Sequence, residues 1–393
     1  MRASMESSQN LAQIRDWIKE FNTRVVVPRA RDLDRNPDPE DCFSWDIVEA
    51  GDAIGLRTLC LGEEYGGAGF DHVATAVVIE ELAHADLGTS VVFAQTIKIS
   101  KVVELVGTKE QRDRILPQYR DDPRALYAIG ITEPDNASNY IIPHRGAAFR
   151  TAARRTEGGW LLNGMKHFIS NGNRARFYLI MAQTEEGNDL AEGSTCFMVE
   201  AGTPGFTIGR VHDKLGERLA NNAELIFNDC FIPDQDVLGE VGKGFDILVK
   251  FFPASNAWAG ASVLGVAQAA YDRSLEWTRK RVQGGRPLIE HDTIAITLAE
   301  MKMDIDVARS YLHQACAAAD GNAEWDPTMS AFPKIAASKA AWKVVTQALE
   351  LHGGYGFMKD LYMEKLLRDA TAFLHSDGVN RSLFLKAARF IRV

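Results

Sequence analysis

An acid beside a glycine near the end of the chain is the side chain best suited to proton transfer. Asp377 is followed directly by Gly378, and an apolar run that includes Phe373 and Leu374 precedes it. A glycine lets a ligand approach the backbone closely, and a carboxylate in such a place can act as a general base. The same pattern is typical of an exposed aspartate at a helix end, so the residues alone leave both interpretations open.

Three further segments combine small and polar residues in ways that suit ligand binding. Residues 131–139 (ITEPDNASN) and 163–173 (NGMKHFISNGN) are rich in hydroxyls and amides, which can hydrogen-bond a polar ring. A glycine-rich turn is formed by Gly353, Gly354 and Gly356. The structural alternatives are a plain loop for the first segment and, at Asn163-Gly164, a β-hairpin turn for the second.

Composition is that of a soluble globular protein with two or three domains. The chain has 393 residues, of which 46% are hydrophobic and 25% are charged, and its formal net charge is −9. This charge argues against a nucleic-acid binder, and no apolar run is long enough to span a membrane. Residues 1–17 (MRASMESSQNLAQIRDW) lack the apolar core of a signal peptide, so we expect a cytoplasmic location.

The cysteines and histidines give no sign of a metal site. Five widely spaced cysteines form no CxxC pair, which favours reduced thiols: Cys42, Cys60, Cys196, Cys230 and Cys316. His144 and His167 also lack the spacing of metal ligands. We therefore expect no metal.

Hydrophobic periodicity predicts helices in the first and last thirds of the chain. Helical spacing covers residues 11–35, 43–55 and 72–122 and resumes at residue 244. One apolar helix face is formed by Ile294, Leu298, Met301, Ile305, Ala308 and Leu312. A second is formed by Ile335, Trp342, Val345 and Leu349.

Short strands are expected between these helical parts. They are separated by Gly, Asn and Pro turns and cover residues 125–132, 160–164, 177–183, 196–200, 206–211 and 224–231. We therefore predict an α+β fold with an N-terminal helical domain (1–124), a middle antiparallel β-barrel or sandwich domain (125–240) and a C-terminal helical bundle (241–393).

The order of the motifs resembles that of acyl-CoA dehydrogenases. Residues 353–357 (GGYGF), then 363–370 (MEKLLRDA), then an acid before a glycine resemble the C-terminal signature of that family. Residues 131–139 and 163–173 resemble its flavin-binding segments, TEPxxxSD and NGxKxWITN. The resemblance extends from about residue 40 to the end and implies the fold of the family and its cofactor, FAD.

The resemblance implies which residues hold FAD. Thr132 would bond the pyrimidine edge of the flavin, and Ser138 would bond the pyrophosphate. Phe168 takes the aromatic place beside the isoalloxazine, and Ser170 takes the place of a threonine near N5. Arg281 and the turn of Gly353, Gly354 and Gly356 would serve the FAD of a neighbouring subunit, which implies a homo-oligomer, most simply a tetramer.

The resemblance also implies a reaction, with departures on the substrate side. Asp377 takes the place of the family's base, usually Glu, which removes the proton α to the thioester carbonyl while the β-hydride passes to the flavin. Ser376 stands where Tyr is usual, and residues 253–256 (PASN) stand where a D-x-x-R pair often contacts CoA. The expected substrate-side residues are Ser255, Asn256, Ser376 and Gly378.

The substrate and electron acceptor follow from the same comparison. Loss of an aromatic ring beside the base opens space, so we expect short, branched or cyclic acyl groups on CoA. Reduced flavin would pass its electrons to an electron-transfer flavoprotein.

Two other functions stay open. Nitroalkane oxidase, a branch of the same superfamily, also uses Asp as its base and has a serine where Ser255 falls. It pairs that Asp with an arginine, however, where this chain has Phe384. The first alternative is therefore a flavin oxidase or monooxygenase acting on a small non-CoA substrate such as a nitroalkane. The second is a flavin-binding or partner protein without catalysis, because the CoA-contact charges are missing.

Overall fold

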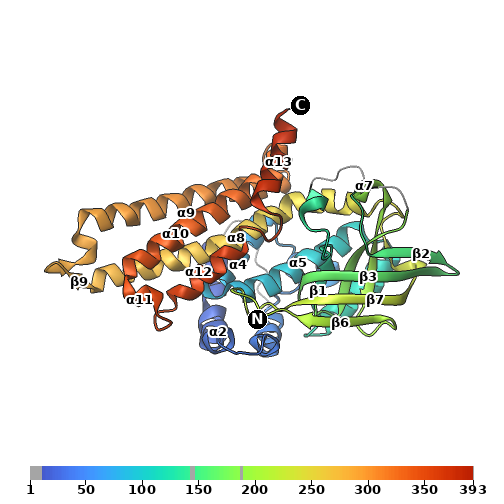
Figure 1. Cartoon of the computed structure of the whole chain (residues 1–393), viewed down its shortest axis with the longest axis horizontal. Coiled ribbons are helices and arrows are strands. Elements are labelled where there is room, and N and C mark those ends of the chain that lie inside the picture. The colour runs from blue at the N-terminus through green and yellow to red at the C-terminus, as the bar shows by residue number, and fades with distance from the viewer. Residues whose placement is uncertain (1–10, 142–146, 186–188, 393) are drawn as a thin grey trace.

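The computed structural model describes residues 11–141, 147–185 and 189–392, and it leaves the side chains of 139–140 and 250–254 undescribed. His144 and part of the N-terminal segment discussed above, residues 1–10, lie outside the described residues. Helices, a sheet and longer helices follow one another along the chain. Figure 1 shows the large sheet at one end of the molecule and the longest helices extending to the other end.

The first part is helical, as predicted. Its helices are α1 (Leu11–Phe21), α2 (Val27–Asp34), α3 (Trp45–Ala53), α4 (His72–Ala85), α5 (Leu87–Val106) and α6 (Lys109–Asp121). A π-helical turn, Asn22–Val26, joins α1 to α2, so the helix expected at 11–35 has a wider turn in its middle. Side chains accept hydrogen bonds from first-turn N–H groups of α3 to α6, and the caps are Ser44, Asp71, Asp86 and Thr108.

The second part is a sheet of eight strands. They are β1 (Tyr127–Gly130), β2 (Ala152–Thr156), β3 (Gly159–Ser170), β4 (Phe177–Gln183), β5 (Ser194–Glu200), β6 (Phe206–Val211), β7 (Asn222–Pro233) and β8 (Val237–Leu238), with the short helix α7 (Leu190–Gly193) between β4 and β5. The order is β6-β7-β3-β2-β4-β5-β8, and β1 pairs with β4. The pairings of β1 and β2 with β4 are parallel, so the sheet is mixed and not purely antiparallel. Long connections from β1 and β2 to β4 allow that direction.

The expected hairpin turn at Asn163-Gly164 is wrong. Both residues lie inside β3, where the register with β7 shifts between Leu162 and Gly164. Gly164 has φ of 138°, and an added Cβ there would lie 2.5 Å from Thr151 Cα. The glycine is therefore needed for a β-bulge and a close approach of chains. The reversal between β2 and β3 lies at Gly158 instead, which has φ of 71°.

The third part consists of long helices. They are α8 (Gly244–Lys280), α9 (Asp292–Ala319), α10 (Phe332–His352), α11 (Gly354–Phe357), α12 (Met363–Ala372) and α13 (Asn380–Ile391), with a small hairpin of β9 (Val282–Gln283) and β10 (Arg286–Pro287). The apolar face predicted for α9 is buried from Leu298 to Leu312, whereas Trp342 on α10 is 39% exposed and lies outside the core face. Among the described residues, no helix is long and apolar enough to cross a membrane. The cytoplasmic location stays a prediction.

A buried ionic cluster joins the first and third parts. Lys365 of α12 is 2% exposed, and its Nζ lies 2.8 Å from Asp86 Oδ2 and 2.5 Å from Asp369 Oδ2. Asp86 also caps α5, and Asp369 accepts a hydrogen bond of 2.7 Å from the N–H of Glu217. Burial opposes the charge of Lys365, but Asp369 and Asp86 outweigh burial and raise its pKa above the ordinary value. The cluster therefore fixes α5, α12 and the loop before β7 to one another.

This cluster generates the first prediction. Lys365→Met keeps the length of the side chain but leaves two buried carboxylates without their cation, so it should lower the free energy of unfolding by about 3–5 kcal/mol. Chemical denaturation measures the change. Lys280→Met is the matched control, because Lys280 pairs with Glu276 on an exposed surface and should change stability by less than about 0.5 kcal/mol. A similar small change for Lys365→Met would show that the cluster does not hold these elements together.

Candidate active site

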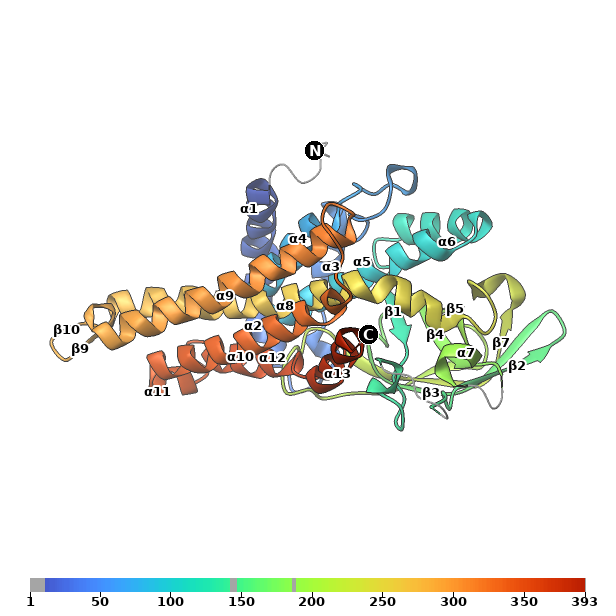
Figure 2. The same ribbon diagram turned by 90° about the horizontal axis from the view of Figure 1, so that it is seen from above.

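A cavity of about 560 Å³ lies where the three parts of the chain meet. Its walls come from α5, the ends of β1 and β3, the loop before β7, the middle of α8 and the turn between α12 and α13. Figure 2 shows α8 running from the long helices at one end of the molecule toward the sheet at the other. Predicted site residues that line the cavity are Thr132, Ser138, Phe168, Ser170, Ser376, Asp377 and Gly378.

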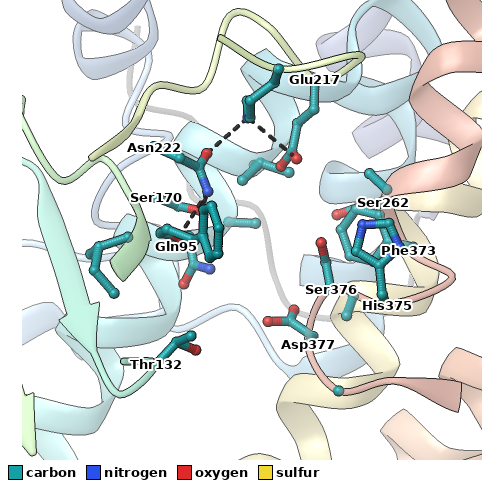
Figure 3. Close-up of a pocket in the computed structure, with 18 of the residues that line it drawn as sticks. Gln95, Thr132, Ser170, Glu217, Asn222, Ser262, Phe373, His375, Ser376 and Asp377 are labelled. Atoms are coloured by element: carbon teal, nitrogen blue, oxygen red, sulfur yellow. Dashed lines mark hydrogen bonds and ion pairs between the residues drawn. The ribbon is translucent and has the colours of Figure 1, made fainter. Parts of the chain in front are cut away.

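Asp377 lies on a tight turn that directs its carboxylate into the cavity (Figure 3). Asp377 has φ of 49° and Gly378 has φ of 96°, both in the left-handed region. A non-glycine residue in that region is uncommon and is often found where a side chain must be aimed for function. An added Cβ at Gly378 would also lie 2.4 Å from Ile141 Cδ1, so no other residue fits there without movement.

Two lysines flank this turn in different ways. Lys334 donates hydrogen bonds of 2.7 Å to the Gly378 carbonyl and 3.0 Å to Asn380 Oδ1, so it holds the backbone of the turn. Burial lowers the pKa of Lys334 to about 8, against the opposing charge of Asp377. Lys98 of α5 instead approaches the acid itself, with its Nζ 3.4 Å from Asp377 Oδ2. The sequence gave no sign of Lys98, because its helix also carries Lys101 and Glu104 and nothing in the local pattern sets Lys98 apart.

His375 also lines the cavity, on the same turn as Asp377. Burial lowers the pKa of the imidazole, and the nearby charge of Lys334 lowers it further. His375 is thus a neutral group at physiological pH, and it is the second candidate for a base in this site.

The opposite side of the cavity carries hydroxyl and amide groups. Ser170 ends β3, and its Oγ accepts a hydrogen bond of 3.5 Å from Asn222 Nδ2, which also donates to the Phe168 carbonyl at 2.9 Å. Phe168 has φ of 59°, is 56% exposed as a residue and lines the cavity. The Thr132 carbonyl accepts from the His167 N–H at 2.8 Å, which joins the two polar segments singled out in the sequence.

A buried ion pair supports this side. Lys166 Nζ lies 2.7 Å from Glu133 Oε1, and both side chains are fully buried. The Glu133 carboxylate also accepts hydrogen bonds from the N–H groups of Arg150 at 2.6 Å and Thr151 at 2.8 Å. Burial lowers the pKa of Lys166 to about 8, although Glu133 opposes that shift. The pair holds Thr132 beside β3.

A second polar group, not predicted as a site from the sequence, lies in the loop before β7 and at the start of β7. Lys214 Nζ lies 2.8 Å from Asn222 Oδ1 and 3.4 Å from Glu217 Oε2, and all three residues line the cavity. Burial raises the pKa of Glu217 and lowers that of Lys214, each against the charge of the other. Only chain folding brings Asn222 to this pair.

Four predicted residues gather at the far end of the long helices. Arg281 follows α8, and its guanidinium lies 5.9 Å from the Trp277 ring centre and 5.7 Å from that of Tyr355. Tyr355 belongs to α11, which also contains Gly354 and Gly356 and is preceded by Gly353. Figure 1 shows α11 and β9 at the end of the helices that lies away from the sheet. None of the four lines the cavity described above.

Ser255 and Asn256 are also placed away from the cavity surface. Both are buried in α8, and Asn256 Nδ2 donates to the Ser330 carbonyl. Ser255 Oγ has no hydrogen-bond partner among the described residues. The side chains of Pro253 and Ala254, which complete this segment, lie outside the described residues.

His167 has neighbours that its sequence position did not reveal. Its Nε2 lies 3.2 Å from Glu224 Oε1, and His212 completes a group whose ligand atoms lie within 4.8 Å of one another. These residues come from different strands or the loop beside them. A hydrogen bond between His167 and Glu224 accounts for the contact without a metal, and the absence of a metal stays a prediction.

Comparison with known proteins agrees with this architecture. The acyl-CoA dehydrogenase N-terminal, middle and C-terminal domain families match residues 8–121, 128–230 and 242–391. A short-chain-specific acyl-CoA dehydrogenase of Megasphaera elsdenii is 31% identical, over 94% of this chain and 96% of the relative. Cyclohex-1-ene-1-carbonyl-CoA dehydrogenase of Syntrophus aciditrophicus is 28% identical, over 96% of this chain and 88% of the relative.

Solved structures show the same likeness. Butyryl-CoA dehydrogenase from Megasphaera elsdenii superposes with a TM-score of 0.90 at 28% identity and covers 98% of this chain and 99% of its own. Fold and sequence together define an FAD-dependent oxidoreductase that acts on the CH–CH bond of acyl-CoA. The chain belongs to the acyl-CoA dehydrogenase family.

Proposed function

We propose that this protein dehydrogenates an acyl-CoA thioester between its α and β carbons, with Asp377 as the base. The observation that carries the proposal is the position of the Asp377 carboxylate. It projects into the cavity from a left-handed turn and faces the side lined by hydroxyl and amide groups. A carboxylate so held can take a proton only from a substrate that lies within hydrogen-bond reach, which suits a general base.

The residues of the cavity fit an FAD ring. Thr132, Ser138 and Ser170 offer hydroxyls, and the open ring of Phe168 offers a flat apolar contact. Gln95 Oε1 is buried beside the cavity without a hydrogen-bond partner among the described residues, as expected of a group that bonds a ligand. When bound, FAD supplies the acceptor for the β-hydrogen, which leaves as hydride.

The chain itself performs the proton transfer and the positioning. Asp377 receives the α-proton, and its backbone N–H is proposed to donate to the thioester carbonyl and so to acidify that proton. Lys334 keeps the turn in place through the Gly378 carbonyl. The Lys166–Glu133 pair keeps Thr132 and β3 in register on the other side. The reacting atoms are thus held between two rigid walls.

The base generates the second prediction. Asp377→Asn keeps size and polarity but cannot accept the proton, so the purified variant should retain FAD and lose flavin reduction by about 10²-fold or more. Anaerobic mixing with acyl-CoA thioesters, followed by flavin absorbance, measures the rate. Asp377→Glu should also impair reduction, because the turn is built for the shorter acid. Near-normal reduction by Asp377→Asn would transfer the role to another group, with His375 first.

The same mixing experiment tests the alternative function. A nitroalkane that bleaches the flavin while no acyl-CoA does so would favour an oxidase of the same fold. Bleaching by acyl-CoA with slow reoxidation by oxygen supports the dehydrogenase and an electron-transfer flavoprotein as its acceptor. A bound flavin that no compound reduces would favour a protein without catalysis.

The substrate is proposed to be a short, branched or cyclic acyl group. Ser376 leaves space beside the base, and the cavity of about 560 Å³ must hold the flavin ring and the acyl chain together. The relative from Syntrophus aciditrophicus is named for a cyclic thioester.

Substrate size generates the third prediction. A branched or cyclic thioester should be turned over at least about tenfold more efficiently than palmitoyl-CoA, because a long chain exceeds the space available. Steady-state kcat/KM with an artificial electron acceptor gives the comparison. Palmitoyl-CoA as the best substrate would be incompatible with the proposed pocket.

The far-end cluster generates the fourth prediction. We propose that Arg281 and the turn of Gly353, Gly354 and Gly356 serve the FAD of a neighbouring subunit in a homotetramer. Arg281→Ala should then weaken FAD retention by about 10–100-fold, because it removes a charge-assisted contact. Equilibrium dialysis and light scattering measure cofactor and oligomeric state. Arg279→Ala, two residues earlier at an exposed position of α8, is the control and should bind FAD normally. A stable monomer that retains FAD would contradict the proposal.

A further inference from the structure

Lys98 places a positive charge in the cavity wall, beside the proposed base. Its side chain is 6% exposed, and its Nζ lies 3.4 Å from Asp377 Oδ2. An ammonium group can donate three hydrogen bonds, and this long contact is its one hydrogen bond within the part of the chain that the structure describes. Lys334, in contrast, makes two shorter bonds to the backbone and side chain of the same turn. Lys98 therefore lines the cavity with N–H groups that have no acceptor among the described residues.

The cavity face of α5 around Lys98 is apolar apart from Gln95. Val91, Ala94 and Ile99 of the same helix line the cavity with it, and Ile131 faces them from the end of β1. A charge in such surroundings is unfavourable unless an anion or several acceptors compensate it. Within the described residues, that compensation comes from Asp377 alone.

The proposed reaction removes this compensation. When Asp377 accepts the α-proton, its carboxylate becomes neutral and Lys98 loses its anionic partner. A plain alkyl chain would offer Lys98 nothing in exchange, so the charge would oppose proton transfer. A substrate that brings its own anion to Lys98 would remove this penalty and leave the base free to act.

We propose that the acyl chain of the substrate carries a carboxylate close to the reacting carbons and that Lys98 is the specificity-determining residue that binds it. The inference rests on the proposed function and names its substrate class, the monothioester of a short dicarboxylic acid. The distance supports the position of the anion. Because Nζ lies within 3.4 Å of the base, an acceptor that reaches Lys98 is only a few bonds from the carbon that Asp377 deprotonates.

The test uses CoA monothioesters of short dicarboxylic acids. Each is compared with its methyl ester, which has nearly the same shape but no charge, and with the alkyl thioester of equal length. Isothermal titration of the purified FAD-loaded protein gives the affinity, and anaerobic mixing gives the rate of flavin reduction. The wild-type protein should bind the free acid about 10–100-fold more tightly than the methyl ester, the range for hydrogen bonds to charged groups.

Three variants assign this preference to Lys98. Lys98→Met keeps the length of the side chain without its charge and should abolish the preference, and Lys98→Arg should restore much of it. Lys101→Met is the matched control on the same helix, because Lys101 pairs with Glu104 at 2.5 Å and does not line the cavity. It should keep the wild-type preference. Retention of bound FAD shows that each variant is folded.

The outcomes separate the inference from the function on which it rests. Equal affinity for free acid and methyl ester in the wild-type protein, or an unchanged preference in Lys98→Met, overturns the inference. Equal reduction of the flavin by all three thioesters overturns it too, while the proposed dehydrogenation stands. A Lys98-dependent preference in binding without any flavin reduction supports the inference and overturns the dehydrogenation.

Discussion

The position of the cavity depends on a single buried cation, Lys365. Its ammonium lies between Asp86 and Asp369, and each carboxylate has a second task, because Asp86 caps α5 and Asp369 accepts from the Glu217 N–H. A charge cluster that is fully buried persists only when its partners stay together. The helix that carries Lys98, the helix that leads to Asp377 and the loop that carries Lys214 are therefore held in one arrangement.

Two further polar contacts hold the walls of the cavity. The pair of Lys166 and Glu133 holds the hydroxyl-bearing side, and Lys334 holds the turn that carries the acid. Three non-glycine residues of the cavity wall have left-handed backbones among the described residues, namely Phe168, Glu217 and Asp377. Such a backbone is tolerated where the surrounding structure over-determines the position. The pocket is thus a rigid gap between two braced walls.

Local pattern and motif order were enough to predict much of this arrangement. The apolar face of α9 follows from helical spacing alone, and the positions of Thr132, Ser170 and Asp377 in one cavity follow from the resemblance. Patterns within a segment cannot report contacts between segments. Asn163-Gly164 has the composition of a turn, yet close approach of Thr151 makes it a bulge.

Lys98 shows that sequence patterns have the same limit when they are used to find functional residues. A lysine within a helix is ordinarily a solvated residue, and only the fold places it beside an acid that lies far along the chain. Asn222 and Lys214 likewise meet only because β7 returns beside the loop that precedes it. Conversely, Arg281 and the glycine turn near Tyr355 form one cluster, as their motifs suggested, although the cluster lies apart from the cavity.

The central claim is that the Asp377 carboxylate removes a proton from the α-carbon of a thioester. Exchange of that proton with solvent isolates this step, if the substrate is replaced by an analogue with sulfur at the β-position, which cannot lose a hydride. The wild-type protein in heavy water should incorporate deuterium at the α-carbon, as followed by NMR, and Asp377→Asn should slow that exchange by about 10²-fold or more. Exchange at the wild-type rate by Asp377→Asn, with FAD still bound, would contradict the account.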